Sequence, residues 1–115
     1  MATTHPTLTA ADRKSLALHM AVAQKLLENQ EILSRARTRV AMWEVGDTVH
    51  PWYVQAWADV LGGSAEQVAA FLANPSEDAC AMRQASPFAG ALEVGERNAV
   101  LREFRNGEPH EPRAA

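Results

Sequence analysis

The three tryptophans of this chain, Trp43, Trp52 and Trp57, all lie within fifteen residues of one another. Large aromatic side chains bury roughly 150–250 Å² each, and they concentrate in hydrophobic cores and in protein interfaces. Gly46 and Pro51 interrupt the same segment, which limits any helix here to a few turns. We therefore expect this segment either to organise the hydrophobic core or to meet a binding partner.

The spacing of apolar residues favours helices throughout the chain. They recur at three- and four-residue steps, whereas the alternating β-branched runs typical of strands are missing. Thr9 with Asp12, and Ser64 with Gln67, resemble capping boxes that begin two helices. The sequence therefore predicts an all-α fold, a single compact bundle of about five to six short helices. The expected helices cover residues 10–28, 30–45, 51–61, 65–74, 77–82 and 94–104.

The first expected helix has an apolar face that is wide for a surface helix, so we expect it to lie centrally. The residues of this face are Leu16, Leu18, Met20, Val22, Leu26 and Leu27. In the second helix, a single stripe is expected to face the core, because its apolar residues follow at steps of four, four and three. The residues of this stripe are Ile32, Ala36, Val40 and Trp43.

Length and composition indicate one globular domain, because 47% of the 115 residues are hydrophobic and 22% are charged. We place this domain at 9–106, with flexible tails at 1–8 and 107–115 that lack periodic apolar residues. There is no apolar run of about 18 residues and no secretory signal. The lone Cys80, expected to be a small buried hydrophobe, cannot form an internal disulfide. These features predict a cytoplasmic protein.

Charge is unevenly distributed along the chain, although the net charge is only −3. Residues 1–39 carry six basic and three acidic side chains, and residues 83–115 carry five of each. No Lys or Arg occurs from Val40 to Met82, so the middle of the chain is acidic and suited to a basic partner. The acidic residues of this middle segment are Glu44, Asp47, Asp59, Glu66, Glu77 and Asp78.

No motif of a hydrolase, a phosphate-binding loop or a zinc site occurs in the sequence. Glu44, Asp47 and His50 follow at three-residue steps, but a glycine and a proline interrupt the helix that would align them. We interpret them as a solvated loop between helices. His19 lies on the apolar first helix and is expected to be a packed or rim histidine. We therefore expect no enzyme activity, no catalytic residue, no metal ligand and no cofactor.

Arg35, Arg37 and Arg39 form the only basic cluster. Arg35 and Arg39 share a helix face, whereas Arg37 points elsewhere. Glu31 precedes Arg35 by four residues, which favours a solvated or salt-bridged helix edge. The functional alternatives are contacts of these arginines to DNA or to an acidic patch on a protein.

The aromatic residues divide between core and surface. Trp43 and Trp57 lie on apolar stripes and are expected in the core. Trp52 and Tyr53 occupy the first turn of the third helix, where at least one ring should face outward. Phe88 lies in the turn segment Ser-Pro-Phe-Ala-Gly, where it either closes the core or contacts another protein.

The pattern of 43–46, Pro51, 57–62 and 64–68 resembles the second half of the Cro/repressor-type helix-turn-helix. In that family W-E-x-G ends the recognition helix and a proline begins the next helix. The resemblance implies a DNA-binding regulator. Residues 27–42 depart from the pattern, because the glutamine-led second helix, the Gly-Val turn and the Ser/Thr-led recognition helix of that family are missing.

A second resemblance covers roughly residues 16–105. The segments at 16–27, 34–46, 50–63, 85–92 and 99–105 follow in the order seen in small bacterial proteins of toxin-antitoxin gene pairs. The sequences SPFAG and LREF are their most particular elements. The usual Ser-Pro/Ala-Glu-Glu start of the last helix is replaced here by Glu-Val-Gly-Glu. The resemblance implies binding to a toxin, which in such pairs can be nucleotidyltransferase-like.

Together these features predict a non-enzymatic antitoxin that binds and covers a cognate protein toxin and that could also repress its own operon. The alternative is a helix-turn-helix regulator that contacts DNA through its arginine cluster. A structural homodimer without either activity is a third reading. The residues expected to bind the partner are Trp52, Tyr53, Phe88, Asp47, Asp59 and Glu66.

Overall fold

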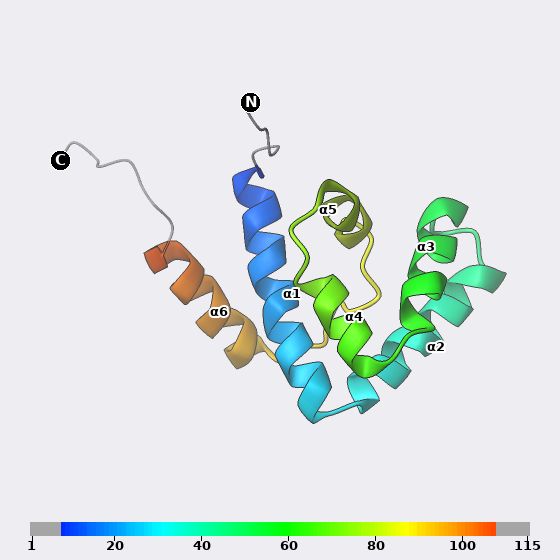
Figure 1. Ribbon diagram of the computed structural model, residues 1–115, viewed down its shortest axis with the longest axis horizontal. Helices are drawn as coiled ribbons and strands as arrows, with labels where there is room; N and C mark the ends of the chain where they lie inside the picture. Colours follow the sequence, from blue (N-terminus) through cyan, green and yellow to red (C-terminus); the bar gives the residue numbers. More distant parts are fainter. Residues whose placement is uncertain (1–7, 108–115) are drawn as a thin grey trace.

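The computed structural model describes residues 8–107, which form six helices and no strand (Figure 1). The all-α prediction is therefore confirmed. The tails predicted at 1–8 and 107–115 fall outside the described residues, apart from Leu8 and Gly107. The helices are α1 (Ala10–Glu28), α2 (Glu31–Val45), α3 (Pro51–Leu61), α4 (Ala65–Leu72), α5 (Glu77–Arg83) and α6 (Val94–Gly107).

Side-chain caps begin α1, α4 and α5, and those of α1 and α4 are the capping boxes that the sequence predicts. The Thr9 hydroxyl accepts the N–H of Asp12 at 3.0 Å, and the Asp12 carboxylate accepts the N–H of Thr9 at 3.3 Å. Ser64 and Gln67 form the same reciprocal pair, at 3.1 and 2.9 Å. The Ser76 hydroxyl caps α5. Each cap satisfies N–H groups that the first turn of a helix leaves without partners.

Helix α1 lies in the middle of the molecule, as its wide apolar face predicts. It packs against α4 on one side and α6 on the other, and α2 and α3 form an antiparallel hairpin that extends away from it (Figure 1). Only Val22, Ala23 and Leu26 of α1 are fully buried. Met20 and Leu27 are 46% and 47% exposed, because the apolar face is wider than the part of α1 that the neighbouring helices cover.

The core is organised around Trp57 of α3, which is fully buried. Its ring meets Phe71 of α4 and Phe88 edge-on, with centroid distances of 5.6 and 6.0 Å. Its indole N–H donates to the carbonyl of Met82 at 3.0 Å, which ties α3 to α5. The predicted core role of Trp57 is confirmed. Trp43 is half-buried and packs against the edge of this core.

The connection between α5 and α6 spans 84–93 and carries Phe88 into the core. At 5% exposure Phe88 closes the core, so the expectation that it contacts a partner is wrong. The guanidinium of Arg39 on α2 donates to the carbonyls of Ala89 and Pro87, at 2.8 and 3.4 Å, and so holds the loop in place. Gly90 has a φ of +83°, a conformation that favours glycine.

Helix α6 packs on α1 through Val100, Leu101 and Phe104, all half-buried, and a polar contact holds its first turn. The ammonium of Lys25 on α1 donates to the carboxylate of Glu96 and also to a loop carbonyl. The Lys25 hydrogen bond, together with the N–H of Glu93, holds the pKa of Glu96 below its usual value. The Glu-Val-Gly-Glu segment therefore caps α6 through a glutamate.

Arg83 at the end of α5 is only 5% exposed and has no carboxylate partner among the described residues. Its guanidinium donates to the carbonyl of Asn74 at 2.8 Å and to the sulfur of Cys80 at 3.3 Å, while its Nε is unpaired. Cys80 itself is half-buried. The neighbouring Ala79 takes the fully buried position that was expected for Cys80.

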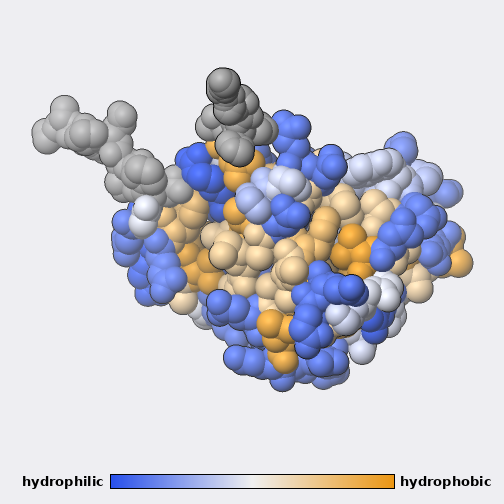
Figure 2. Space-filling view, in the orientation of Figure 1, coloured by the Kyte–Doolittle hydropathy of each residue, from blue (hydrophilic) through white to orange (hydrophobic). Residues whose placement is uncertain are grey.

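Apolar residues gather in the middle of the face shown in Figure 2, over α1 and the helices beside it, and hydrophilic residues surround them. Among the described residues, no helix combines the length and apolar character needed to cross a membrane.

We predict that Trp57→Phe lowers the free energy of unfolding by about 2–3 kcal/mol, because it removes a buried hydrogen bond and leaves a cavity. Trp52→Phe is the matched control, and we expect a change of less than about 0.5 kcal/mol at that half-exposed position. Urea unfolding followed by circular dichroism measures both. Similar losses in the two variants would contradict the central role of Trp57.

Candidate partner-binding surface on the α2–α3 hairpin

The hairpin of α2 and α3 ends in a surface that we call the hairpin tip, residues 42–55. Val45 is 87% exposed, Met42 66% and Trp52 51%. Half-buried Trp43 and Tyr53 lie beneath them and pack against the core. Large apolar side chains are rarely exposed together at the end of a projecting hairpin unless something binds there.

The local sequence explains why Trp52 faces outward. The Nδ1 atom of His50 accepts the N–H of Trp52 at 3.0 Å, so His50 caps α3, and Pro51 occupies the first turn. Trp52 and Tyr53 meet edge-on, with a centroid distance of 5.0 Å and an interplanar angle of 82°. Tyr53 packs inward and Trp52 is exposed, so the two rings form one aromatic unit at the tip.

Carboxylates flank Val45 along the chain, whereas Met42 lines a separate cavity together with Arg35 and Arg39. Glu44 and Asp47 are exposed, and both line a cavity of about 530 Å³ between the end of α2 and the start of α3. Asp59 lies further along α3, where its carboxylate accepts a hydrogen bond from Gln55 at 3.0 Å. Because residues 40–82 contain no Lys or Arg, nothing within this part of the chain neutralises these charges.

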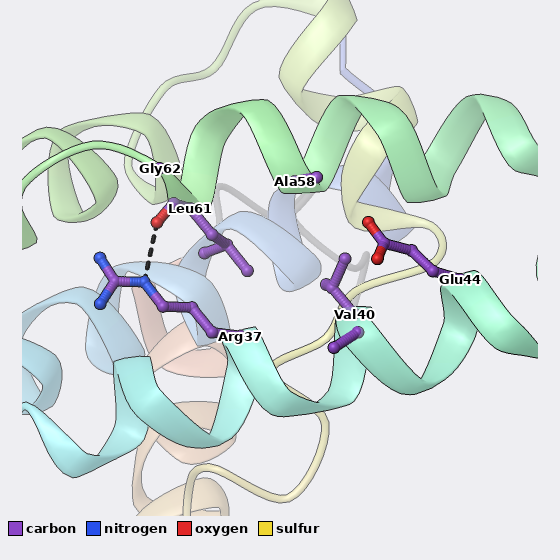
Figure 3. Close-up of a pocket in the computed structure, with 7 residues that line it drawn as sticks. Arg37, Val40, Glu44, Ala58, Leu61 and Gly62 are labelled. Carbon is purple, nitrogen blue, oxygen red and sulfur yellow. Dashed lines mark hydrogen bonds between the residues drawn. The ribbon is translucent and has the colours of Figure 1, made fainter.

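A groove of about 310 Å³ separates α2 from α3 behind the tip. Figure 3 shows Arg37 and Glu44 rising from α2 at the two ends of this groove, with Val40 between them. Arg37 donates to the carbonyls of Leu61 and Gly63, at 2.8 and 3.1 Å. Arg37 thus closes one end of the groove by binding the last turn of α3, and Glu44 leaves the end near the tip acidic.

The structure brings together three of the six residues expected to bind a partner. Trp52, Tyr53 and Asp47 share the hairpin tip. Asp59 is exposed two turns further along α3, and Glu66 lies beyond the opposite end of that helix, roughly 16 Å away along its axis. Glu66 is therefore not part of the same surface. Phe88, the sixth residue, is buried.

Sequence reasoning missed Met42 and Val45. The signal was present, because both lie next to the core stripe that ends at Trp43 without belonging to it. On a helix whose other faces are polar, apolar residues that lie outside the core stripe are candidates for an interface.

The three arginines of α2 all have partners within the chain. Arg35 pairs with Glu31 at 3.3 Å, which confirms the predicted salt-bridged edge. Arg37 and Arg39 donate to backbone carbonyls of α3 and of the 84–93 loop. The turn before α2 is only two residues, 29–30, and α2 packs chiefly on α3. The arginines thus hold the hairpin and the loop in place.

No group of His, Cys, Asp and Glu that could hold a metal ion occurs within residues 8–107. In line with its interpretation as a solvated loop, the segment around Asp47 is exposed. Comparison with models of protein families, with curated proteins and with solved structures finds no match.

We predict that Arg37→Ala lowers the free energy of unfolding by about 1 kcal/mol or more, because two carbonyls lose a charged donor. Arg35→Ala should change it by less than about 0.5 kcal/mol, because that ion pair is exposed to solvent. Urea unfolding compares the two variants directly. A larger loss for Arg35 than for Arg37 would contradict the bracing role of Arg37.

Proposed function

We propose that this protein is an antitoxin-type binding protein that covers a basic surface of a cognate protein toxin with its hairpin tip. The observation that carries the proposal is the exposure of Val45, Met42 and Trp52 in the hairpin tip, which also holds the exposed carboxylates of Glu44 and Asp47. The resemblance to small proteins of toxin-antitoxin gene pairs supports the same function.

The tip has the composition of a protein interface. Tryptophan and tyrosine supply large contact area from side chains with few rotatable bonds, and they dominate binding energy at many interfaces. Trp52 is already ordered by its contact with Tyr53, so little conformational entropy is lost when a partner covers it. The apolar side chains of Met42 and Val45 extend this contact area along α2.

The charge of the tip favours a basic partner. Glu44 and Asp47 lie at the tip, and Asp59 lies two turns along α3. A toxin that acts on RNA or nucleotides, such as a nucleotidyltransferase-like enzyme, needs a basic surface for its phosphate-containing substrate. An acidic tip would be attracted to that surface, which accelerates association and excludes phosphate competitors.

The helix-turn-helix alternative receives less support from the geometry. Arg37 and Arg39 are engaged with backbone carbonyls, and the carboxylates of the tip would repel the phosphate backbone of DNA. No observation favours DNA binding by α2.

Co-expression with the product of the neighbouring gene tests the proposal. We expect the two proteins to co-purify and the antitoxin-type chain to restore growth that its partner inhibits. The proposal is rejected if the two proteins do not co-purify and growth is not restored.

The binding surface is tested with pairs of matched variants. We predict that Val45→Ala weakens the complex about fivefold and Trp52→Ala about 30-fold or more, since each removes apolar contact area from the interface. Val94→Ala is the matched control for Val45, because Val94 is 75% exposed on α6, far from the tip in sequence. Isothermal titration calorimetry of the purified partner measures these changes. Equal effects of Val45→Ala and Val94→Ala would place the interface elsewhere.

A further inference from the structure

His19 of α1 and Ser86 of the 84–93 loop form a hydrogen-bonded pair between segments 67 residues apart. The Nε2 atom of His19 lies 2.9 Å from the Ser86 hydroxyl oxygen, and its Nδ1 atom lies 2.8 Å from the carbonyl oxygen of Ser15. Because a carbonyl oxygen can only accept, Nδ1 must carry a hydrogen. In the neutral ring, Nε2 is then the acceptor of the Ser86 hydroxyl proton.

This arrangement has the three parts of an activated serine. Ser86 provides the hydroxyl, His19 provides a base within hydrogen-bond distance, and the Ser15 carbonyl fixes the tautomer and orientation of that base. The Ser86 oxygen also accepts the N–H of Phe88 at 3.1 Å. A donor in this position stabilises negative charge on the oxygen as its proton leaves.

The pair faces a cavity of about 440 Å³ between α1, the loop and α6, which is within the size range of small-molecule sites. Leu18, Val22, Phe88 and Leu92 make its walls largely apolar. Arg97 of α6 lines the same cavity and supplies a positive charge. The site therefore suits a short acyl chain attached to a group that becomes negatively charged during reaction.

We propose that Ser86 is a nucleophile that takes an acyl group from carboxylic esters with short apolar acyl chains, and that His19 is its general base. This activity is separate from the hairpin tip, so it does not depend on the proposed function.

The reaction conserves atoms and electrons without an oxidant or reductant. The Ser86 oxygen bonds to the ester carbonyl carbon while its proton passes to Nε2 of His19. The bond between that carbon and the alcohol oxygen then breaks, and the alcohol leaves with the proton from Nε2. Water attacks the acyl-serine in the same way, which releases the carboxylic acid and regenerates the Ser86 hydroxyl.

Incubation of the whole protein with 4-nitrophenyl butyrate tests the proposal. We expect rapid release of one equivalent of 4-nitrophenol and a mass increase of one butyryl group that peptide mapping places on Ser86. Ser86→Ala should abolish this acylation, and His19→Gln should slow it about 100-fold or more, because a general base is lost. Ser34→Ala is the matched control, since Ser34 is an exposed helical serine, and it should react like the unchanged protein.

The pH profile distinguishes a base from a merely structural histidine. Burial, with a further contribution from Arg83 of α5, lowers the pKa of His19, and the hydrogen bond to the Ser15 carbonyl only partly opposes this. The charged groups that face His19 are Arg83 from α5 and Arg97, which lines its cavity from α6. Because the neutral ring is the active form, acylation should persist below pH 6.5 and decline only at lower pH.

Label on lysines instead of Ser86 in the unchanged protein would overturn the proposal, and so would a rate that does not change in His19→Gln. The mapping uses the unchanged protein, so it remains decisive even if Ser86→Ala fails to fold. Circular dichroism of both variants verifies that they are folded.

Discussion

The burial of the Trp57 indole is the interaction on which the rest of the structure depends. Its ring contacts Phe71 of α4 and Phe88 of the long loop, and its N–H binds the Met82 carbonyl of α5. One side chain thus joins four segments that follow each other along the chain. Because it lies on α3, the same contacts fix the direction in which the α2–α3 hairpin leaves the body of the protein.

The division of the hairpin into a buried base and an exposed tip follows from this. The stripe of α2 that ends at Trp43 packs toward the core, and Arg37 and Arg39 tie α2 to the end of α3 and to the loop. Side chains beyond that stripe, such as Met42 and Val45, have no segment left to cover them. The exposed tip is a consequence of a core that is complete without it, and this makes it available to a partner.

The local signals of the sequence identified the helices well. Thr9 and Ser64 cap helices as predicted, because each capping box is formed by residues only three positions apart. Burial was harder to predict. Phe88 lies in a turn that either buries or exposes it, and that choice depends on Trp57 and Arg39, which are 31 and 49 residues distant in the chain. The contact between His19 and Ser86 could not be predicted for the same reason, because these residues are 67 positions apart in the chain.

The sequence by itself determined the all-α class, the ends of the helices and the acidic middle segment, since these depend on near neighbours and on composition. Only the tertiary structure decided that Phe88 closes the core, that two arginines act as braces, and that Ser86 lies against His19. Those outcomes depend on which distant segments share space, and that is set by the packing of all six helices at once.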